Sequence, residues 1–353
     1  MSIQPTPGPP PAQGRDGGRP PETPEEPPGG APQREAEPAA PTLRPARPRW
    51  RETLSLLAHN PTAAIASVVL LLIVVVAVFD DALAPQGANE ISVTDRLQPP
   101  SWEHPFGTDD LGRDILSRVV LGASVSLRVG FLAVGFALVV GTLIGLLAGY
   151  YGRWVDDVLM RFMDMLFAFP AVLLAIAVLA VRGPGSGNTA LAIGIVYTPI
   201  FARVTRASVL GVREEVYVRA SRSVGASDWR ILTRHILPNA APPIIVQTSI
   251  SLAFAVLAEA ALSFLGLGTQ PPNPSWGLML AEGRGFIELA WWLAFFPGMA
   301  IFLTVLCFNL LGDGLRDVLD PRTAPASPAT GSTTTPTRWR TSGRPSSPSR
   351  PAR

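Results

Sequence analysis

The sequence predicts an all-α integral membrane protein with about six transmembrane helices. Hydrophobic residues make up 47% of the 353-residue chain. Charged residues make up only 16%, compared with roughly 25% in a typical soluble domain. The apolar stretches approach the roughly 20 residues that a helix needs to cross a hydrocarbon core about 30 Å thick. The predicted spans are about 62–79, 125–151, 163–181, 188–210, 240–266 and 289–312.

Glycines predict close helix packing in one of these spans, and prolines predict kinks in two others. Gly141, Gly145 and Gly149 recur every four residues in the second span. Such a strip lets the backbone of another helix approach closely, so we interpret it as a packing surface. Pro170 in the third span and Pro199 in the fourth predict kinks.

The placement of arginine predicts the orientation of the spans. All 29 cationic residues are arginines, and several crowd the connection between the fourth and fifth spans: Arg203, Arg206, Arg213, Arg219, Arg222, Arg230 and Arg234. Because cationic residues are enriched in cytoplasmic loops, this connection is predicted to be cytoplasmic. Both termini then lie in the cytoplasm as well. The long acidic link from Asp80 to Gly122 lies outside.

Composition also divides the chain into three parts. Residues 1–49 are dominated by Pro, Gly, Ala, Glu and Arg, and residues 323–353 by Ser, Thr, Pro and Arg. Neither segment can bury enough apolar surface to offset its chain entropy, so both are predicted to be disordered cytoplasmic tails. Between them, residues 50–322 are expected to form one transmembrane domain in contact with membrane lipid.

The outer link contains a second candidate helix, over residues 104–122. Thr108 is a suitable N-cap, and Asp109 and Asp110 fall in the acidic first turn that helices favour. An apolar stripe follows at intervals of four residues: Leu111, Ile115 and Val119. We therefore predict a helix lying along the outer membrane surface. Its aspartates are interpreted as solvated capping residues and not as a metal or catalytic cluster.

A charged helical hairpin is predicted over residues 211–239. Its first helix is amphipathic, with an apolar stripe at Val212, Val216, Ala220 and Val224. Gly225 suits the left-handed position that ends a helix, Ser227 can cap the next helix, and Pro238 is predicted to stop it. The residues leave two interpretations open: a solvated loop between spans, or a docking element for a cytoplasmic partner.

The chain lacks the residues that common enzymatic sites need. No lysine occurs, so a phosphate-binding P-loop is excluded and any ATP must be hydrolysed by another subunit. His59, His104 and His235 fall in unrelated segments, and Cys307 is the single cysteine. We predict no catalytic residue, no metal site and no cofactor. The net charge of +2 reflects arginines that membrane topology explains, so no nucleic-acid partner is expected.

Glu259 is the ionisable residue that stands out at membrane depth, with Asp164 near the start of the third span as a weaker case. Charges within a bilayer are costly and tend to face cavities or partners. Two interpretations of Glu259 remain open: a place on a translocation path, or an interhelical hydrogen bond that fixes packing.

Residues 217–239, YVRASRSVGASDWRILTRHILPN, resemble the loop signature of ATP-binding-cassette importer permeases. Gly225, Leu237 and Pro238 match that signature in residue type and spacing. Arg219 stands where the family usually has glutamate, and Ser221 stands where it has the second alanine. Further stretches that begin at His104, Gly152, Glu259 and Phe308 resemble the C-type permease subunit of dipeptide, oligopeptide and nickel importers.

This resemblance implies the type I importer permease arrangement in a bacterial cytoplasmic membrane. It also implies a homologous B-type permease, two cytoplasmic ATPase subunits and an extracytoplasmic substrate-binding protein as partners. The hairpin would then couple the spans to an ATPase. The residues that the resemblance assigns to coupling are Arg219, Ala220, Ser221, Gly225, Ala226, Ser227, Asp228, Leu237 and Pro238.

On this basis we expect a transport subunit, not an enzyme, that translocates dipeptides or oligopeptides. The same architecture also fits import of nickel or another small solute. A secondary transporter that works without ATP is a weaker alternative, because Glu259 alone offers thin support for ion coupling and the hairpin would have no role.

Overall fold

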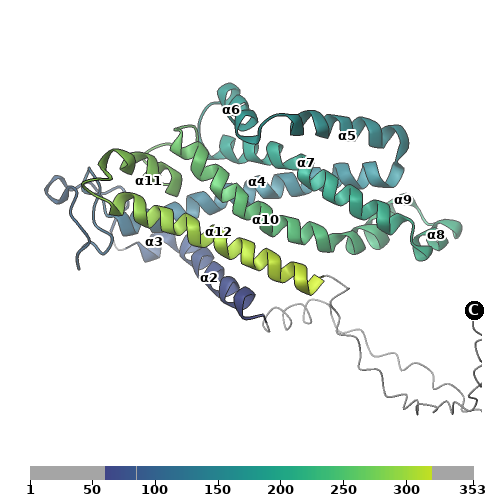
Figure 1. Ribbon diagram of the computed structural model, residues 1–353, viewed down its shortest axis with the longest axis horizontal. Coiled ribbons are helices and arrows are strands. Elements are labelled where there is room, and N and C mark those ends of the chain that lie inside the picture. The colour runs from purple at the N-terminus through teal and green to yellow at the C-terminus, as the bar shows by residue number, and fades with distance from the viewer. Residues whose placement is uncertain (1–59, 85, 320–353) are drawn as a thin grey trace, which may run out of the picture. The chain divides into compact units, whose positions relative to one another are not determined.

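The chain is mainly helical in the residues that the computed structural model describes, 60–84 and 86–319 (Figure 1). Within those ranges no β-strand is formed, and a lone antiparallel bridge joins Thr108 to Asp114. The predicted all-α fold class is therefore confirmed. The two predicted tails, 1–49 and 323–353, lie outside the described residues.

Five helices in the described ranges are long and apolar enough to cross a membrane. They are α2 (Pro61–Val78), α4 (Ile115–Tyr151), α7 (Ser186–Arg213), α10 (Leu237–Phe264, with the turns that precede it) and α12 (Trp292–Leu319). Two shorter helices, α5 (Arg153–Ala168) and α6 (Ala171–Arg182), satisfy the same criterion only as a pair. The count of five or six agrees with the prediction of about six spans.

Short elements gather at the two ends of the bundle (Figure 1). One group consists of α3 (Asp80–Leu83), η1 (Val93–Asp95), α11 (Trp276–Gly283) and η3 (Arg284–Phe286). We call this side, with its connecting loops, the loop end. The other group consists of α8 (Val216–Ser223), α9 (Asp228–Ile231) and the π-helical turn η2 (Leu232–Ile236). We call that side the hairpin end.

Helix α4 packs more extensively against α7 than against any other element, because glycines leave its contact face without side chains. A Cβ atom at Gly141 would lie 2.6 Å from the Cβ atom of Phe201. At Gly145 it would lie 2.5 Å from the carbonyl oxygen of Ala202, and at Gly149 it would lie 2.8 Å from the Cβ atom of Val209. The packing strip predicted from the sequence is thus confirmed.

The remaining spans surround this pair. Helix α10 packs on α12, α7 and α4, and α2 lies against α12 and α4. Small side chains again fill the centre: Ala133, Ala137, Ala192 and Ala255 are fully buried. Pro199 lies inside α7, which nevertheless continues without interruption from Ser186 to Arg213.

The third predicted span, 163–181, is not one helix. It is divided between α5 and α6, which meet at an angle of 92°. Phe169, between them, has φ of −82° and ψ of 137°, and Pro170 immediately precedes α6. Proline disfavours the helical region for the residue before it and has no N–H to donate, so a break replaces the kink that the sequence suggested.

The separate surface helix predicted over residues 104–122 is not formed. Helix α4 already begins at Ile115, where the expected span began near residue 125. Its N-cap is Asp114, whose carboxylate accepts a hydrogen bond from the Ser117 N–H at 2.8 Å. The predicted cap Thr108 is instead buried, and its hydroxyl oxygen accepts a bond from the Gln98 N–H at 2.8 Å. The part of the link between η1 and α4 therefore folds as turns that lead directly into a long span.

The glycine strip provides a test of this packing. Gly145→Ala places a Cβ atom against a backbone carbonyl and should destabilise the bundle by about 1–3 kcal/mol, the usual cost of overpacking. Gly135→Ala in the same helix is the matched control, because a Cβ atom there would meet nothing within 4 Å. That control should be neutral or stabilising by up to about 1 kcal/mol. Thermal unfolding in detergent measures both, and equal midpoints would contradict the assigned packing.

Candidate functional site

The hairpin at the end of α7 turns at Gly225. This residue has φ of +81°, in the left-handed region that favours glycine. The Gly225 N–H donates to the Arg222 carbonyl at 3.0 Å, and the Ala226 N–H donates to the Ser221 carbonyl at 3.1 Å. These two bonds form the Schellman arrangement that closes α8. The left-handed turn predicted at Gly225 is therefore confirmed.

An apolar cluster holds the base of the hairpin against the ends of α4 and α7. Val218 from α8 and Ile231 from α9 are fully buried. They belong to one cluster with Leu146 and Tyr150 of α4 and Val209 of α7. Burying apolar side chains of this size stabilises by roughly 1.5–3 kcal/mol each, so the base is a folded unit of the bundle and not a loose loop.

Polar contacts reinforce the same attachment. The Tyr150 hydroxyl donates to an Asp228 carboxylate oxygen at 2.5 Å, and the Arg222 guanidinium lies 5.3 Å from the centre of the Tyr150 ring. Arg213 donates to the carbonyl oxygens of Gly149 at 2.9 Å and of Tyr150 at 3.2 Å. The sequence did not reveal these contacts of Tyr150 and Arg213, because their partners are distant along the chain.

The outer face of the hairpin is apolar and exposed. Val216, Val224 and Trp229 are 72%, 84% and 75% exposed. The sequence placed Val212, Val216, Ala220 and Val224 on one apolar stripe, but Val212 belongs to α7 and packs on the base cluster. Val216, Ala220 and Val224 are exposed, while Val218 is buried. A surface of this kind, at the tip of a charged segment, is typical of a protein interaction site.

The predicted coupling residues form two groups. Gly225, Ala226 and Asp228 lie at or beside the hairpin turn, and Arg219, Ala220 and Ser221 lie on α8. Arg219 is exposed, and no ion pair engages it in the part of the chain that the structure describes. Ser227 occupies the predicted N-cap position of α9, but its side chain makes no capping bond.

Leu237 and Pro238 form the second group, in the first turn of α10. The sequence predicted that Pro238 stops the second hairpin helix. Instead, the π-helical turn η2 joins α9 to α10, and Pro238 falls at a position where a missing N–H is tolerated. The helical path therefore continues from the hairpin into a membrane-spanning helix.

Glu259, near the loop end of α10, is fully buried. Its carboxylate accepts a hydrogen bond from the Ser263 hydroxyl at 2.6 Å, and the side chains of Ser126, Thr269 and Ser275 surround it. The Ser126 and Ser275 hydroxyl oxygens in turn accept backbone N–H groups at the start of α11. The second carboxylate oxygen of Glu259 is buried and has no hydrogen-bond partner among the described residues. Full burial of Glu259 between residues of α4, α10 and α11 favours the packing interpretation.

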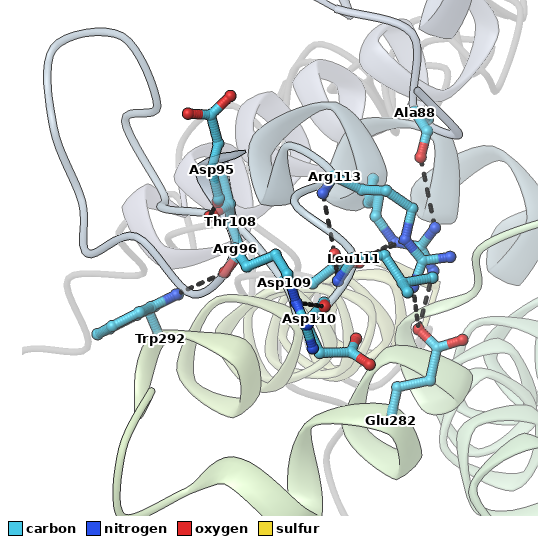
Figure 2. Close-up of polar contacts among 11 residues, drawn as sticks. Ala88, Asp95, Arg96, Thr108, Asp109, Asp110, Leu111, Arg113, Glu282 and Trp292 are labelled. Atoms are coloured by element: carbon cyan, nitrogen blue, oxygen red, sulfur yellow. Dashed lines mark hydrogen bonds and ion pairs between the residues drawn. The ribbon is translucent and has the colours of Figure 1, made fainter. Parts of the chain in front are cut away.

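The loop end contains a buried ion-pair network that sequence analysis missed (Figure 2). Arg113 and Asp109 are joined at 2.5 Å, and Arg118 lies 2.9 Å from a Glu282 oxygen. Arg113 also approaches Glu282 at 3.4 Å, and Arg118 donates to the Ala88 carbonyl at 3.3 Å. Asp109 is 4% exposed, so its interpretation as a solvated capping residue is wrong.

Aromatic and polar contacts complete this network. The Trp292 indole N–H donates to the Thr108 carbonyl at 3.1 Å, as Figure 2 shows. The Phe106 and Phe296 rings stack with centroids 3.9 Å apart. His104 lies 3.2 Å from an oxygen of the α4 cap residue Asp114. The link between α2 and α4 is therefore fastened to α4, α11 and α12 and forms a compact cap on the bundle.

Comparison with known proteins identifies the family to which this helical bundle belongs. The sequence profile of the family described as "Binding-protein-dependent transport system inner membrane component" matches residues 141–325. The chain belongs to this family. A second profile, the N-terminal transmembrane domain of oligopeptide transport permease C, matches residues 48–100 of the permease. The sequence-based assignment to the permeases of ATP-binding-cassette importers is confirmed.

Curated relatives of the permease carry related names. The dipeptide transport system permease protein DppC of Alkalihalophilus pseudofirmus is 48% identical over 77% of this chain and 90% of its own. The glutathione transport system permease protein GsiD of Pectobacterium atrosepticum is 46% identical over 78% and 92%. A chain of the MetNI methionine transporter aligns at 19% identity, with a TM-score of 0.47, over 57% of this chain and 96% of that one.

Family membership defines the role of the chain in general terms. The permease is the membrane component of an ATP-binding-cassette importer and not itself an enzyme. It is a multi-pass protein of the bacterial inner membrane. It works with ATPase and substrate-binding partners, as members of this family do.

The packing interpretation of Glu259 predicts different outcomes for two substitutions. Glu259→Gln retains an acceptor for the Ser263 hydroxyl and should leave both stability and uptake near those of the unmodified protein. Glu259→Leu strands buried hydroxyl groups and should destabilise by about 1–3 kcal/mol. Thermal unfolding and uptake in reconstituted vesicles measure these effects. Loss of uptake by a stably inserted Glu259→Gln protein would instead place Glu259 on the translocation path.

Proposed function

We propose that this chain is the C-type permease subunit of an importer that carries dipeptides or oligopeptides into the cell, driven by separate ATPase subunits. Relatives at 46–48% identity are named as permeases for dipeptides, glutathione and peptides. Their alignments cover at least 90% of each relative, so the similarity extends across the transmembrane bundle. Glutathione is itself a short peptide, and the three names therefore describe one class of solute.

The proposed orientation places the hairpin end in the cytoplasm and the loop end outside. Arginines concentrate from Arg203 to Arg234, at the hairpin end, as the positive-inside tendency requires. Residues 50–322 then form the permease domain, with both tails in the cytoplasm. The compact loop end would face the substrate-binding protein, and a homologous B-type permease would complete the pore.

The hairpin is proposed to dock in a groove on one of two ATPase subunits. The observation that carries this proposal is the contrast between its two faces. Val216, Val224 and Trp229 are exposed at the tip, whereas Val218 and Ile231 are buried at the base. Exposed aromatic and apolar side chains beside exposed arginines such as Arg219 are the residues that commonly anchor protein interfaces.

Continuity of the helical path explains how docking would produce movement. The hairpin is closed by the Schellman turn at Gly225 and continues through η2 into α10. A displacement of the tip is therefore carried by a connected helical element and not absorbed in a flexible linker. Because α10 packs on α4, α7 and α12, its movement would reach most of the bundle.

The turn supplies a specific test of coupling. Gly225→Val should abolish uptake while the protein remains inserted, because a β-branched side chain resists positive φ at a cost of about 1–2 kcal/mol. Gly225→Asn should retain much of the activity, since asparagine tolerates this conformation. Gly211→Val is a nearby control, because its Cβ atom would meet nothing within 4 Å. Normal uptake by Gly225→Val at equal membrane abundance would contradict the coupling role.

Substrate and energy source can be tested together in the reconstituted assembly. We expect uptake of a labelled dipeptide or oligopeptide that stops when the catalytic glutamate of the ATPase partner is replaced. Uptake that persists without ATP hydrolysis would overturn the proposal in favour of a secondary transporter. Uptake of nickel with no uptake of peptide would retain the ATP-driven mechanism but replace the substrate.

A further inference from the structure

Helix α5 carries a charged face that is part neither of the hairpin nor of the loop-end network. Its members follow one another at spacings of three, one, three, one and three residues, so they share one side of the helix. They line an open hollow of about 650 Å³. We call them the vestibule face: Asp157, Met160, Arg161, Asp164, Met165 and Ala168.

An adjoining side of α5 is fixed to the bundle. Asp156 accepts two hydrogen bonds from Arg206 of α7, both at 2.5 Å. Met163 is 1% exposed and is the buried residue of this helix. A two-pronged contact between carboxylate and guanidinium sets the rotation of α5 about its own axis. The vestibule face is therefore held in a fixed orientation, with Asp164 within reach of Arg203 on α7.

The charges on this face are accessible. Asp164 pairs with Arg203 of α7 at 2.7 Å, with side chains 62% and 42% exposed. Arg161 is also exposed, and in the described ranges neither it nor Asp157 forms an ion pair. Opposite charges four residues apart on a helix can pair with each other, yet these two do not. Each remains available to a ligand.

The membrane makes contact of this face with lipid unfavourable. Helices α5 and α6 are long and apolar enough to cross a membrane only as a bent pair, and ionisable groups at membrane depth face water-filled cavities or partners because exposure to hydrocarbon is costly. Exposed apolar side chains occur on both halves, with Val158 and Phe162 on α5 and Leu173 and Val181 on α6. The vestibule face differs from them by its charged side chains.

We propose that the vestibule face lines the inner part of the translocation path, where Arg161 binds the carboxylate and Asp157 or Asp164 the ammonium group of a peptide in transit. The choice of ligand rests on the proposed peptide-import function. Asp157 and Arg161 lie about 6 Å apart along the helix axis. An extended dipeptide spans about 7 Å. Met160 and Met165 supply flexible apolar contacts that suit varied peptide side chains.

Cysteine labelling tests whether the face meets water. Met160→Cys and Met165→Cys are prepared in the complete assembly, in inverted vesicles, and exposed to a membrane-impermeant maleimide. The native Cys307 is buried and serves as the unlabelled reference. We expect both variants to react and excess dialanine to slow the reaction. Reaction only with a lipid-soluble maleimide, or with neither reagent because a partner permease covers the face, would overturn the proposal.

Charge recognition is tested by the dialanine concentration that halves the labelling of Met160→Cys. Adding Arg161→Gln should raise this concentration about tenfold, equivalent to ~1.4 kcal/mol, while Arg161→Lys should leave it nearly unchanged. Dialanine amide, which lacks the carboxylate, should protect about tenfold less well and be insensitive to Arg161→Gln. Equal effects of that substitution on both peptides would overturn the assigned role of Arg161.

These outcomes distinguish failure of the proposed vestibule site from failure of the proposed peptide-import function. Labelling uses peptide added directly to the exposed side, so it depends neither on the substrate-binding protein nor on ATP. An assembly that imports dialanine but gains no protection from it refutes the vestibule site alone. An assembly that imports no peptide refutes the proposed substrate, and absent protection then refutes peptide binding at this face as well.

Discussion

The close approach of α4 and α7 is the contact on which the other parts of the permease depend. Glycines bring the two backbones together, and both helices extend to the hairpin end. There, α4 contributes Tyr150 and α7 contributes Arg213 to the base of the hairpin. Helix α7 also holds α5 through the contact between Arg206 and Asp156. One tight helix pair thus positions both the hairpin and the vestibule face.

Charged side chains have different environments at the two ends of the bundle. At the loop end, Asp109, Arg113 and Arg118 are buried and satisfy one another together with Glu282. Buried pairs of this kind contribute fixed geometry more than net stability. At the hairpin end, Arg219 is exposed and has no ion-pair partner in the described residues. The ion-pair network at the loop end is therefore satisfied within the chain, whereas Arg219 at the hairpin end is available to a partner.

Sequence alone predicted the features that depend on nearby residues. Hydropathy identified the spans, four-residue spacing identified the glycine strip, and Gly225 revealed the turn, because each signal is local. The ion-pair network was missed because Arg113 and Glu282 are 169 residues apart in the chain. Pro238 was misjudged because the effect of a proline depends on the turn before it, here a π-helical one. Docking of the hairpin and peptide binding at α5 stay predictions, since both involve molecules beyond this chain.

The loop-end network also has an evolutionary consequence. Its two carboxylates and two guanidiniums balance, so replacing one member leaves a buried charge without compensation, at a cost of several kcal/mol. Amino-acid substitutions at these positions must then occur in compensating pairs, because a protein with a single substitution is destabilised and selected against. Related permeases should consequently retain or replace four residues together: Asp109, Arg113, Arg118 and Glu282. Neighbouring exposed residues of the same loops remain free to diverge one at a time.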